Sequence, residues 1–213
     1  MKRINFLGSP MDVASMSETI ALIRDRILRQ EFTQHVVVNV AKLVNMRKDP
    51  ELAQSVTECD IINIDGMGVV WGARFLGHQV PERVAGVDLF LELNAMAAEE
   101  QMPVFYLGAK PEIVEKIRQS GAKLLFVAIT SPKKENFINR WQEQLGVLFV
   151  MGVGGTFDVV AGHVSRAPLW MQKAGLEWLY RVLQEPGRMW KRYLITNSRY
   201  AWLLLNEKIK PKN

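Results

Sequence analysis

The chain has 213 residues and a formal net charge of +5, and its 48% hydrophobic and 23% charged content is ordinary for one folded globular domain. Its single cysteine, Cys59, excludes an internal disulfide, and no stretch approaches the roughly 20 consecutive apolar residues that cross a bilayer. The first residues also turn polar before a signal-length apolar run develops, so we expect a cytoplasmic chain that does not span a membrane.

Short apolar or β-branched runs alternate with helical patterns along most of the chain. We predict buried strands at residues 35–39, 60–64, 104–107, 123–128 and 147–151. Helices are predicted to begin at Asp49-Pro50 and at Lys110-Pro111, and Gly121 to end the second one. Strands separated by helices predict an α/β fold: a Rossmann-like, mainly parallel sheet with helices on both faces.

The residues that follow the predicted strands are polar or rich in glycine. Ligands of such sheets bind at the carboxyl ends of the strands, so these residues are the candidates for chemistry. The five strand ends are expected to form one cleft, and they carry Asn39, Asp65, Gly108 with Lys110, the segment 130–133 and the segment 152–156.

Asp65 stands between a predicted strand and the flexible Gly66-Met67-Gly68. A partly buried carboxylate at this place suits a general base, but Asp is also a favoured helix cap. Arg83 could grip a phosphate with its planar guanidinium or pair with the neighbouring Glu82. Spacing alone leaves both alternatives open.

Two further segments suit an anionic ligand. The glycine-rich residues 152–158 lead into a helix, whose free N–H groups favour a phosphate, although a tight strand-to-helix turn has the same pattern. Ser131-Pro132-Lys133-Lys134 places two cations at a helix start, which is unfavourable unless an anion such as a diphosphate lies there. The alternative is a solvated charge cluster.

The sequence offers no metal-ligand spacing. His35, His78 and His163 are isolated from one another, Cys59 has no partner cysteine, and no Asp-x-Asp pair is present. We therefore expect no metal and no cofactor. Arg, Lys and helix N-termini would then have to stabilise the negative charge of a departing nucleotide.

Charge and aromatic character shift together near residue 163. The residues from 163 to 213 contain ten Lys or Arg against three Glu, a net charge of +7, and four of the six tryptophans. We predict an α/β domain at 1–162 and a helical appendage at 163–213. Its amphipathic pattern suits an interfacial helix on anionic lipid, whereas nucleic acid, a helix docked on the body and a homo-oligomer are the alternatives.

Seven segments together resemble the WecG/TagA/CpsF glycosyltransferases, in family order and over nearly the whole chain. They are residues 38–44, 64–71, 82–89, 107–111, 131–135, 152–158 and 166–181. The resemblance implies inverting transfer of a sugar from a UDP-sugar, often UDP-N-acetylmannosamine or its uronic acid, to an undecaprenyl-diphosphate-linked acceptor in bacterial cell-surface polysaccharide or teichoic acid synthesis. It also implies a peripheral enzyme on the inner face of the cell membrane that uses no nucleic acid.

The resemblance assigns roles to individual residues. It implies that Asp65 is the base that takes the proton of the acceptor hydroxyl. The implied substrate-binding residues are Asn39, Arg83, Gly108, Lys110, Ser131, Lys133, Lys134, Gly152, Gly154, Gly155, Thr156 and Asp158, with Arg181, Arg188, Lys191 and Arg192 in an appendage that closes over the site.

The chain departs from the family's pattern at two places. Lys134 stands where many members have Gln, which bears on donor selectivity. The helix predicted after Lys110 runs into Ser120-Gly121, where the family has a further strand and most of another helix. Either the chain has lost one α/β unit between about Glu115 and Ser120, or this segment is absent from the sequence. Two other functions use fewer of these features. A nucleotide-dependent oxidoreductase would rest on the sheet and the glycine turn, and a non-catalytic membrane- or nucleic-acid-binding protein on the basic tail.

Overall fold

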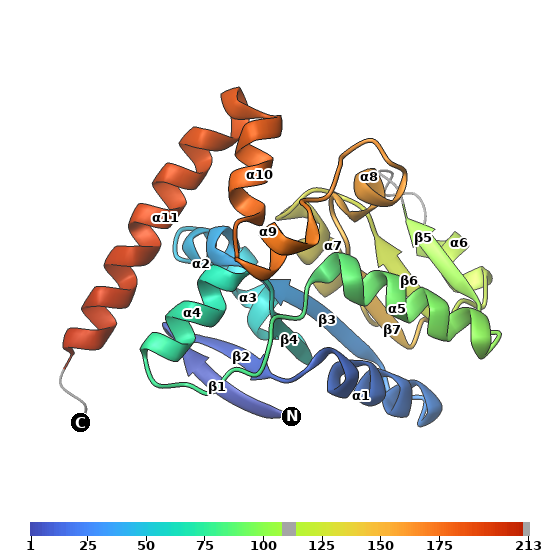
Figure 1. Cartoon of the computed structure of the whole chain (residues 1–213). Coiled ribbons are helices and arrows are strands. Elements are labelled where there is room, and N and C mark those ends of the chain that lie inside the picture. Colours follow the sequence, from blue (N-terminus) through green and yellow to red (C-terminus); the bar gives the residue numbers. More distant parts are fainter. Residues whose placement is uncertain (108–113, 211–213) are drawn as a thin grey trace.

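The protein is an α/β structure with a mostly parallel central sheet (Figure 1). The structure, a computed structural model, describes residues 1–107 and 114–210. Its strands are β1 (Lys2–Phe6), β2 (Ser9–Val13), β3 (Thr33–Val38), β4 (Ile61–Ile64), β5 (Val104–Leu107), β6 (Leu124–Val127) and β7 (Phe149–Gly152). Its helices are α1 (Met16–Leu28), α2 (Val40–Met46), α3 (Pro50–Thr57), α4 (Met67–Phe75), α5 (Gly86–Glu99), α6 (Val114–Gln119), α7 (Lys133–Trp141), α8 (Thr156–Val160), α9 (Leu169–Lys173), α10 (Glu177–Gln184) and α11 (Pro186–Ile209).

Within the described residues the sheet has seven strands in the order β1-β2-β4-β3-β7-β6-β5. Only the pair β1–β2 is antiparallel, and the other five neighbouring pairs are parallel. The five predicted strands are confirmed as β3 to β7, within two residues at their ends. The predicted start of α3 is also confirmed, because Asp49 caps it and Pro50 is its first residue. The start predicted at Lys110-Pro111 lies outside the described residues.

Helices cover both faces of the sheet, which explains why its central strands are buried along nearly their whole length. Alternate residues of each strand point to opposite faces. Ile61, Phe126 and Phe149 pack with α1 and α5 on one face. Ile62 and Ile64 pack with α2, α3 and α4 on the other face, where α6 and α7 cover β6 and β7.

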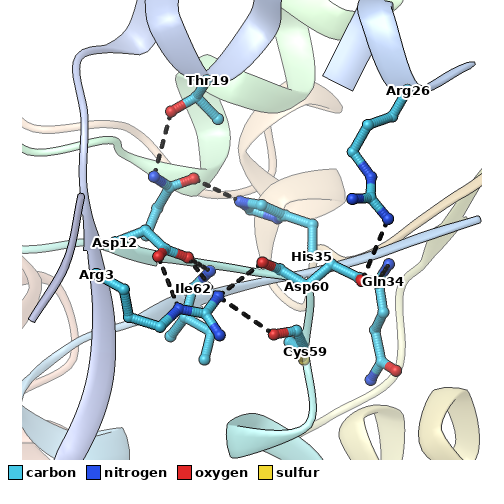
Figure 2. Close-up of polar contacts among 10 residues, drawn as sticks. Arg3, Asp12, Thr19, Arg26, Gln34, His35, Cys59, Asp60 and Ile62 are labelled. Carbon is cyan, nitrogen blue, oxygen red and sulfur yellow. Dashed lines mark hydrogen bonds and ion pairs between the residues drawn. The ribbon is translucent and has the colours of Figure 1, made fainter. Parts of the chain in front are cut away.

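A buried polar network ties β2, β3 and β4 together (Figure 2). The Asp12 carboxylate of β2 accepts two hydrogen bonds of 2.8 Å from the Arg3 guanidinium and one of 2.8 Å from the Ile62 backbone N–H in β4. In β3, His35 Nε2 lies 2.9 Å from Asn63 Oδ1. Burial lowers the pKa of His35 to about 4, so the imidazole is neutral in the folded chain and serves the core rather than chemistry.

The appendage forms a helical hairpin of α10 and α11 beside the sheet (Figure 1). The hairpin docks on the body through α11, which packs against α2 and α4. Tyr200 of α11 is buried, and its hydroxyl donates a 2.9 Å hydrogen bond to the Gly68 carbonyl. Leu203 and Leu204 pack against the same core cluster. The division of the chain into two domains at residue 163 stays a prediction.

Candidate active site

A pocket of about 340 Å³ lies between the carboxyl edge of the sheet and the appendage. This volume is in the range of small-molecule sites. The body contributes the residues after β3 and β4 and the segment 83–87, and α10 and α11 supply the opposite wall. Of the predicted site residues, those that line the pocket are Asn39, Asp65, Arg83, Arg181 and Arg192.

Asp65 follows β4 directly and lies partly buried in this pocket. Its backbone N–H donates to the Val38 carbonyl at 2.9 Å, which holds the end of β4 against β3. The next residue, Gly66, has a φ of +102° and precedes α4 without a side-chain cap. Asp65 therefore does not cap that helix, and the cap interpretation is wrong.

The surroundings of Asp65 make its carboxylate more basic. Burial raises the pKa of the Asp65 carboxyl above its ordinary value, and the nearby Glu177 carboxylate acts in the same direction. The Arg83 guanidinium, the Gly86 backbone N–H and Arg181 act against this rise. A carboxylate whose pKa is raised toward neutrality accepts a proton more readily, as a general base requires.

Arg83 pairs with the appendage and not with Glu82. Its Nη1 donates a 2.8 Å hydrogen bond to Oε2 of Glu177, and its Nη2 lies 3.5 Å from Oε1 of Gln172. Glu82 instead accepts the Met16 backbone N–H at 2.6 Å. The interpretation of Arg83 as a partner of Glu82 is therefore wrong, and Arg83 connects the body to α10.

A second ion pair holds the appendage on the body. The Arg166 guanidinium donates to both carboxylate oxygens of Asp88 in α5, with a distance of 2.7 Å from Nη2 to Oδ2. Arg166 lines the pocket, and its Nε is buried without a hydrogen-bond partner in the described part of the chain. Sequence reasoning did not assign Arg166, Asp88 or Glu177 to the site.

Lys134 lies at the start of α7, beside the glycine turn, and is not among the residues that line the pocket. Its side chain lies against Gly152 and Gly154 of the turn. A Cβ at Gly152 would come within 2.8 Å of Cδ of Lys134, and a Cβ at Gly154 within 2.8 Å of its Nζ. Nζ is 3.8 Å from Oε1 of Glu135, which Lys42 of α2 also binds at 2.8 Å. Burial and then Lys42 lower the pKa of Lys134 to about 8. The solvated-cluster interpretation is therefore wrong for Lys134, whereas Lys133 is exposed.

The other predicted site residues fall outside the pocket lining. Ser131, Gly155, Asp158 and Lys191 are exposed, and Thr156 is buried with its hydroxyl donating to the Val153 carbonyl at 2.7 Å. Gly108 and Lys110 lie outside the described residues, as does the side chain of Arg188. The expectation that all five strand ends line one cleft is therefore wrong for the ends of β6 and β7. Asn39 lines the pocket and also caps α2, where its Oδ1 accepts the Lys42 N–H at 3.0 Å.

Aromatic side chains form part of the pocket wall. Trp71 of α4, Trp178 of α10 and Tyr193 of α11 line it, and the rings of Trp178 and Tyr193 are 5.9 Å apart. Elsewhere on the appendage, apolar side chains face solvent: Leu169, Trp170, Leu183, Trp190, Leu194, Trp202, Leu205 and Ile209. Within the described residues, no helix is long and apolar enough to span a membrane.

This site belongs to an α/β protein that presents a basic carboxylate among guanidinium groups at the carboxyl edge of its sheet, an arrangement that suits proton transfer next to an anionic ligand. A family model described as glycosyl transferase WecG/TagA/CpsF family matches residues 4–116 and 111–213. The chain belongs to this family, and the resemblance noted in the sequence is confirmed. The family makes it a glycosyltransferase of cell-surface polysaccharide synthesis.

The two matched segments meet at residues 111–116, close to the position where the sequence departs from the family's pattern. In the structure, β5 and β6 on either side of this position are direct parallel neighbours, paired from Val104 with Leu124 to Leu107 with Val127. The sheet is therefore continuous across this position.

Proposed function

We propose that this chain transfers a sugar from a UDP-sugar to a polyprenyl-diphosphate-linked acceptor, with inversion at the sugar carbon and with Asp65 as the general base. The observation that carries the proposal is an unpaired carboxylate that faces several arginines in one pocket. Among the described residues, the ion pairs there join Arg83 and Arg181 to Glu177 and Arg166 to Asp88, and none includes Asp65.

Inverting transfer needs one base on the acceptor side, while the nucleotide leaves from the opposite face of the sugar. Asp65 takes the proton of the attacking hydroxyl as the new glycosidic bond forms. The bond to the UDP oxygen breaks, and UDP carries away the electron pair. The raised pKa of the Asp65 carboxyl supports this role, because it makes the carboxylate a stronger proton acceptor.

The positive charges suit two diphosphates. On the appendage side, Arg181 and Arg192 line the pocket, and we assign them, with Arg188 and Lys191, to the acceptor diphosphate. On the other side, the buried Lys134 and the turn at Gly152 and Gly154 are assigned to the diphosphate of the donor. Cationic side chains then offset the charge of the leaving nucleotide, and we propose that the transfer needs no metal.

The exposed apolar and aromatic residues of the appendage support attachment to the inner face of the bacterial cell membrane. Indole and leucine side chains enter the interfacial region of a bilayer, and lysines and arginines of the same helices are attracted to anionic lipid. This placement would bring the pocket to a lipid-linked acceptor. The alternative to membrane attachment is that a second copy of the chain packs against these residues.

Transfer is tested by a screen of UDP-sugars against a short-chain polyprenyl-diphosphate sugar, with UDP release as the readout. Asp65→Asn should lower turnover by roughly 10²–10⁴-fold, because it removes the base and keeps the side-chain shape. Asp25→Asn on α1, remote from the pocket, is the matched control and should keep wild-type turnover. Near-wild-type turnover of Asp65→Asn would remove the catalytic assignment, and activity that disappears with EDTA and returns with Mg²⁺ would contradict metal-free transfer.

Membrane attachment is tested with vesicles that contain phosphatidylglycerol or only phosphatidylcholine. The wild-type chain should sediment with the anionic vesicles, and the double substitution Trp170→Ser, Trp190→Ser should weaken this binding. Light scattering in the absence of lipid then checks the alternative. A stable dimer that the same double substitution dissociates would show that a second copy covers these residues.

Family membership favours transfer over the other functions that the sequence left open. Calorimetry with UDP and with NAD separates the transferase from an oxidoreductase, and we expect binding of UDP alone. The same titration separates it from a non-catalytic tail-binding protein, which would bind neither nucleotide.

A further inference from the structure

Glu177 lies at the centre of the contacts between the appendage and the catalytic edge of the sheet. Its Oε2 is 2.8 Å from Nη1 of Arg83, which belongs to the body, and its Oε1 is 3.6 Å from Nη2 of Arg181, one turn further along α10. The Glu177 and Arg83 side chains are 18% and 14% exposed. Each carboxylate oxygen of Glu177 therefore faces a different arginine. The pair with Arg83 is largely shielded from water, whereas the Arg181 side chain is half-exposed.

The bridge explains why Asp65 stays unpaired in a pocket rich in arginine. Both Arg83 and Arg181 are close enough to favour the charged form of Asp65, yet their ion pairs are with Glu177. Without the Glu177 carboxylate, the only remaining negative group near both guanidiniums in the described pocket wall is Asp65. A guanidinium paired with Asp65 would occupy the oxygen lone pairs that must receive the acceptor's proton.

We propose that Glu177 is a positioning residue for the transfer: its carboxylate draws Arg83 and Arg181 away from Asp65, so that the base stays free and both guanidiniums face the ligand. This inference rests on the proposed function of Asp65. It gives α10 a part in proton transfer besides its contacts to a diphosphate.

Several charged or titratable groups in the described part of the chain interact with Asp65. From the segment before α5 comes Arg83, and from α10 come Glu177 and Arg181. Arg166 before α9, Tyr193 on α11 and Lys134 on α7 also interact with Asp65. Of these groups, Glu177 is the carboxylate that forms ion pairs with Arg83 and Arg181.

Removal of the Glu177 charge should therefore act on Asp65 in one direction. The negative neighbour that disfavours ionisation of Asp65 is lost, and the released Arg83 and Arg181 favour ionisation more strongly. Both changes lower the pKa of the Asp65 carboxyl. If the bridge only fastens α10, the arginines stay in place when Glu177 is neutralised. The pKa of Asp65 then falls only by the smaller amount that comes from loss of the negative neighbour, so the size of the shift separates the two roles.

The titration of Asp65 can be measured without any substrate. Aspartate residues are labelled with ¹³C at the side-chain carboxyl, and the signal of Asp65 is identified by its absence in Asp65→Asn. The chemical shift is followed with pH in the wild type, in Glu177→Gln and in the matched control Glu207→Gln, which removes a carboxylate from the far end of α11. We expect a lower midpoint in Glu177→Gln and an unchanged midpoint in Glu207→Gln.

An unchanged or raised midpoint in folded Glu177→Gln would overturn the inference. If Glu177→Gln does not fold, Arg181→Gln serves in its place, since it removes a cation and should raise the midpoint. No rise in that variant would equally contradict the bridge. In the transfer assay, Glu177→Gln should lower kcat/KM by about 10- to 100-fold, and Glu207→Gln should not. Turnover by Asp65→Asn would refute the proposed function, whereas the titration of Asp65 would still decide the role of Glu177.

Discussion

Docking of the appendage depends on a close approach between α4 and α11. At Gly72 of α4, a Cβ would overlap the hydroxyl oxygen of Tyr200 and come within 3.0 Å of Cζ of Tyr200 and Cδ2 of Leu204. The hydroxyl itself is fixed by its 2.9 Å hydrogen bond to the Gly68 carbonyl. Gly72→Ala should therefore push Tyr200 out of its place and break this hydrogen bond.

The size of the destabilisation by Gly72→Ala follows from three contributions to the free energy of unfolding. Overpacking costs about 1–3 kcal/mol and the lost hydrogen bond about 1 kcal/mol, whereas alanine in place of glycine within a helix contributes a gain of about 1 kcal/mol. The net loss is about 1–3 kcal/mol, measured by urea denaturation. Gly187→Ala is the matched control, because a Cβ at Gly187 of α11 would meet no atom within 4 Å, so this substitution should leave stability unchanged or raise it by up to about 1 kcal/mol.

A double-mutant cycle isolates the contact responsible. Tyr200→Phe removes the hydroxyl oxygen that a methyl group at Gly72 would overlap, and the nearest of the remaining contacts are the two carbon atoms at 3.0 Å. Gly72→Ala should cost close to nothing in the Tyr200→Phe background, which gives a coupling of about 2 kcal/mol between the two sites. Additive effects of the two substitutions would show that α11 is not docked against α4 at this point.

Three further predictions concern buried groups. Because burial lowers the pKa of His35 from 6.5 to about 4, the unfolded chain binds the proton first as the pH falls. The stabilisation that depends on the neutral imidazole is complete above about pH 6.5 and is lost as the pH falls toward 4. The total loss in the free energy of unfolding is about 3 kcal/mol. Urea denaturation at several pH values should show this loss in the wild type but not in His35→Gln. The affinity for a UDP-sugar, measured by calorimetry, should fall as the pH rises through about 8 and Lys134 loses its charge, and Lys134→Gln should lack this step. Burial raises the pKa of the Cys59 thiol to about 12, so the native chain should react with a thiol reagent such as DTNB only as fast as it opens, and rapid labelling under native conditions would contradict this.

The local pattern of the sequence was sufficient for the parallel core of the fold. β4, β6 and most of β3 are buried on both faces, so their apolar runs identify them without reference to the rest of the chain. The hairpin of β1 and β2 was not predicted. Its strands are short and β1 is largely exposed, and its signal is limited to Leu7-Gly8, which turn with φ values of 51° and 71°.

Part of the candidate site could also be predicted from the sequence. Asn39 and Asp65 follow adjacent parallel strands, and strand ends of this kind meet at one edge of a sheet. The ends of β6 and β7 carry equally polar residues, but these lie outside the lining of the pocket. Whether a strand end faces a cavity depends on what packs above it, and the appendage lies above β3 and β4.

The partners of the pocket's arginines were decided by the tertiary structure alone. Arg83 pairs with Glu177 at a separation of 94 residues, and Arg166 pairs with Asp88 at a separation of 78 residues. Local pattern and spacing describe neighbours along one helix or strand, so they offered Glu82 as the partner of Arg83. The sequence by itself determined that Asn39 and Asp65 stand at the carboxyl edge of the sheet. Only the folding of α10 and α11 onto that edge decided which charges neutralise one another there, and it leaves Asp65 outside the ion pairs of the described residues.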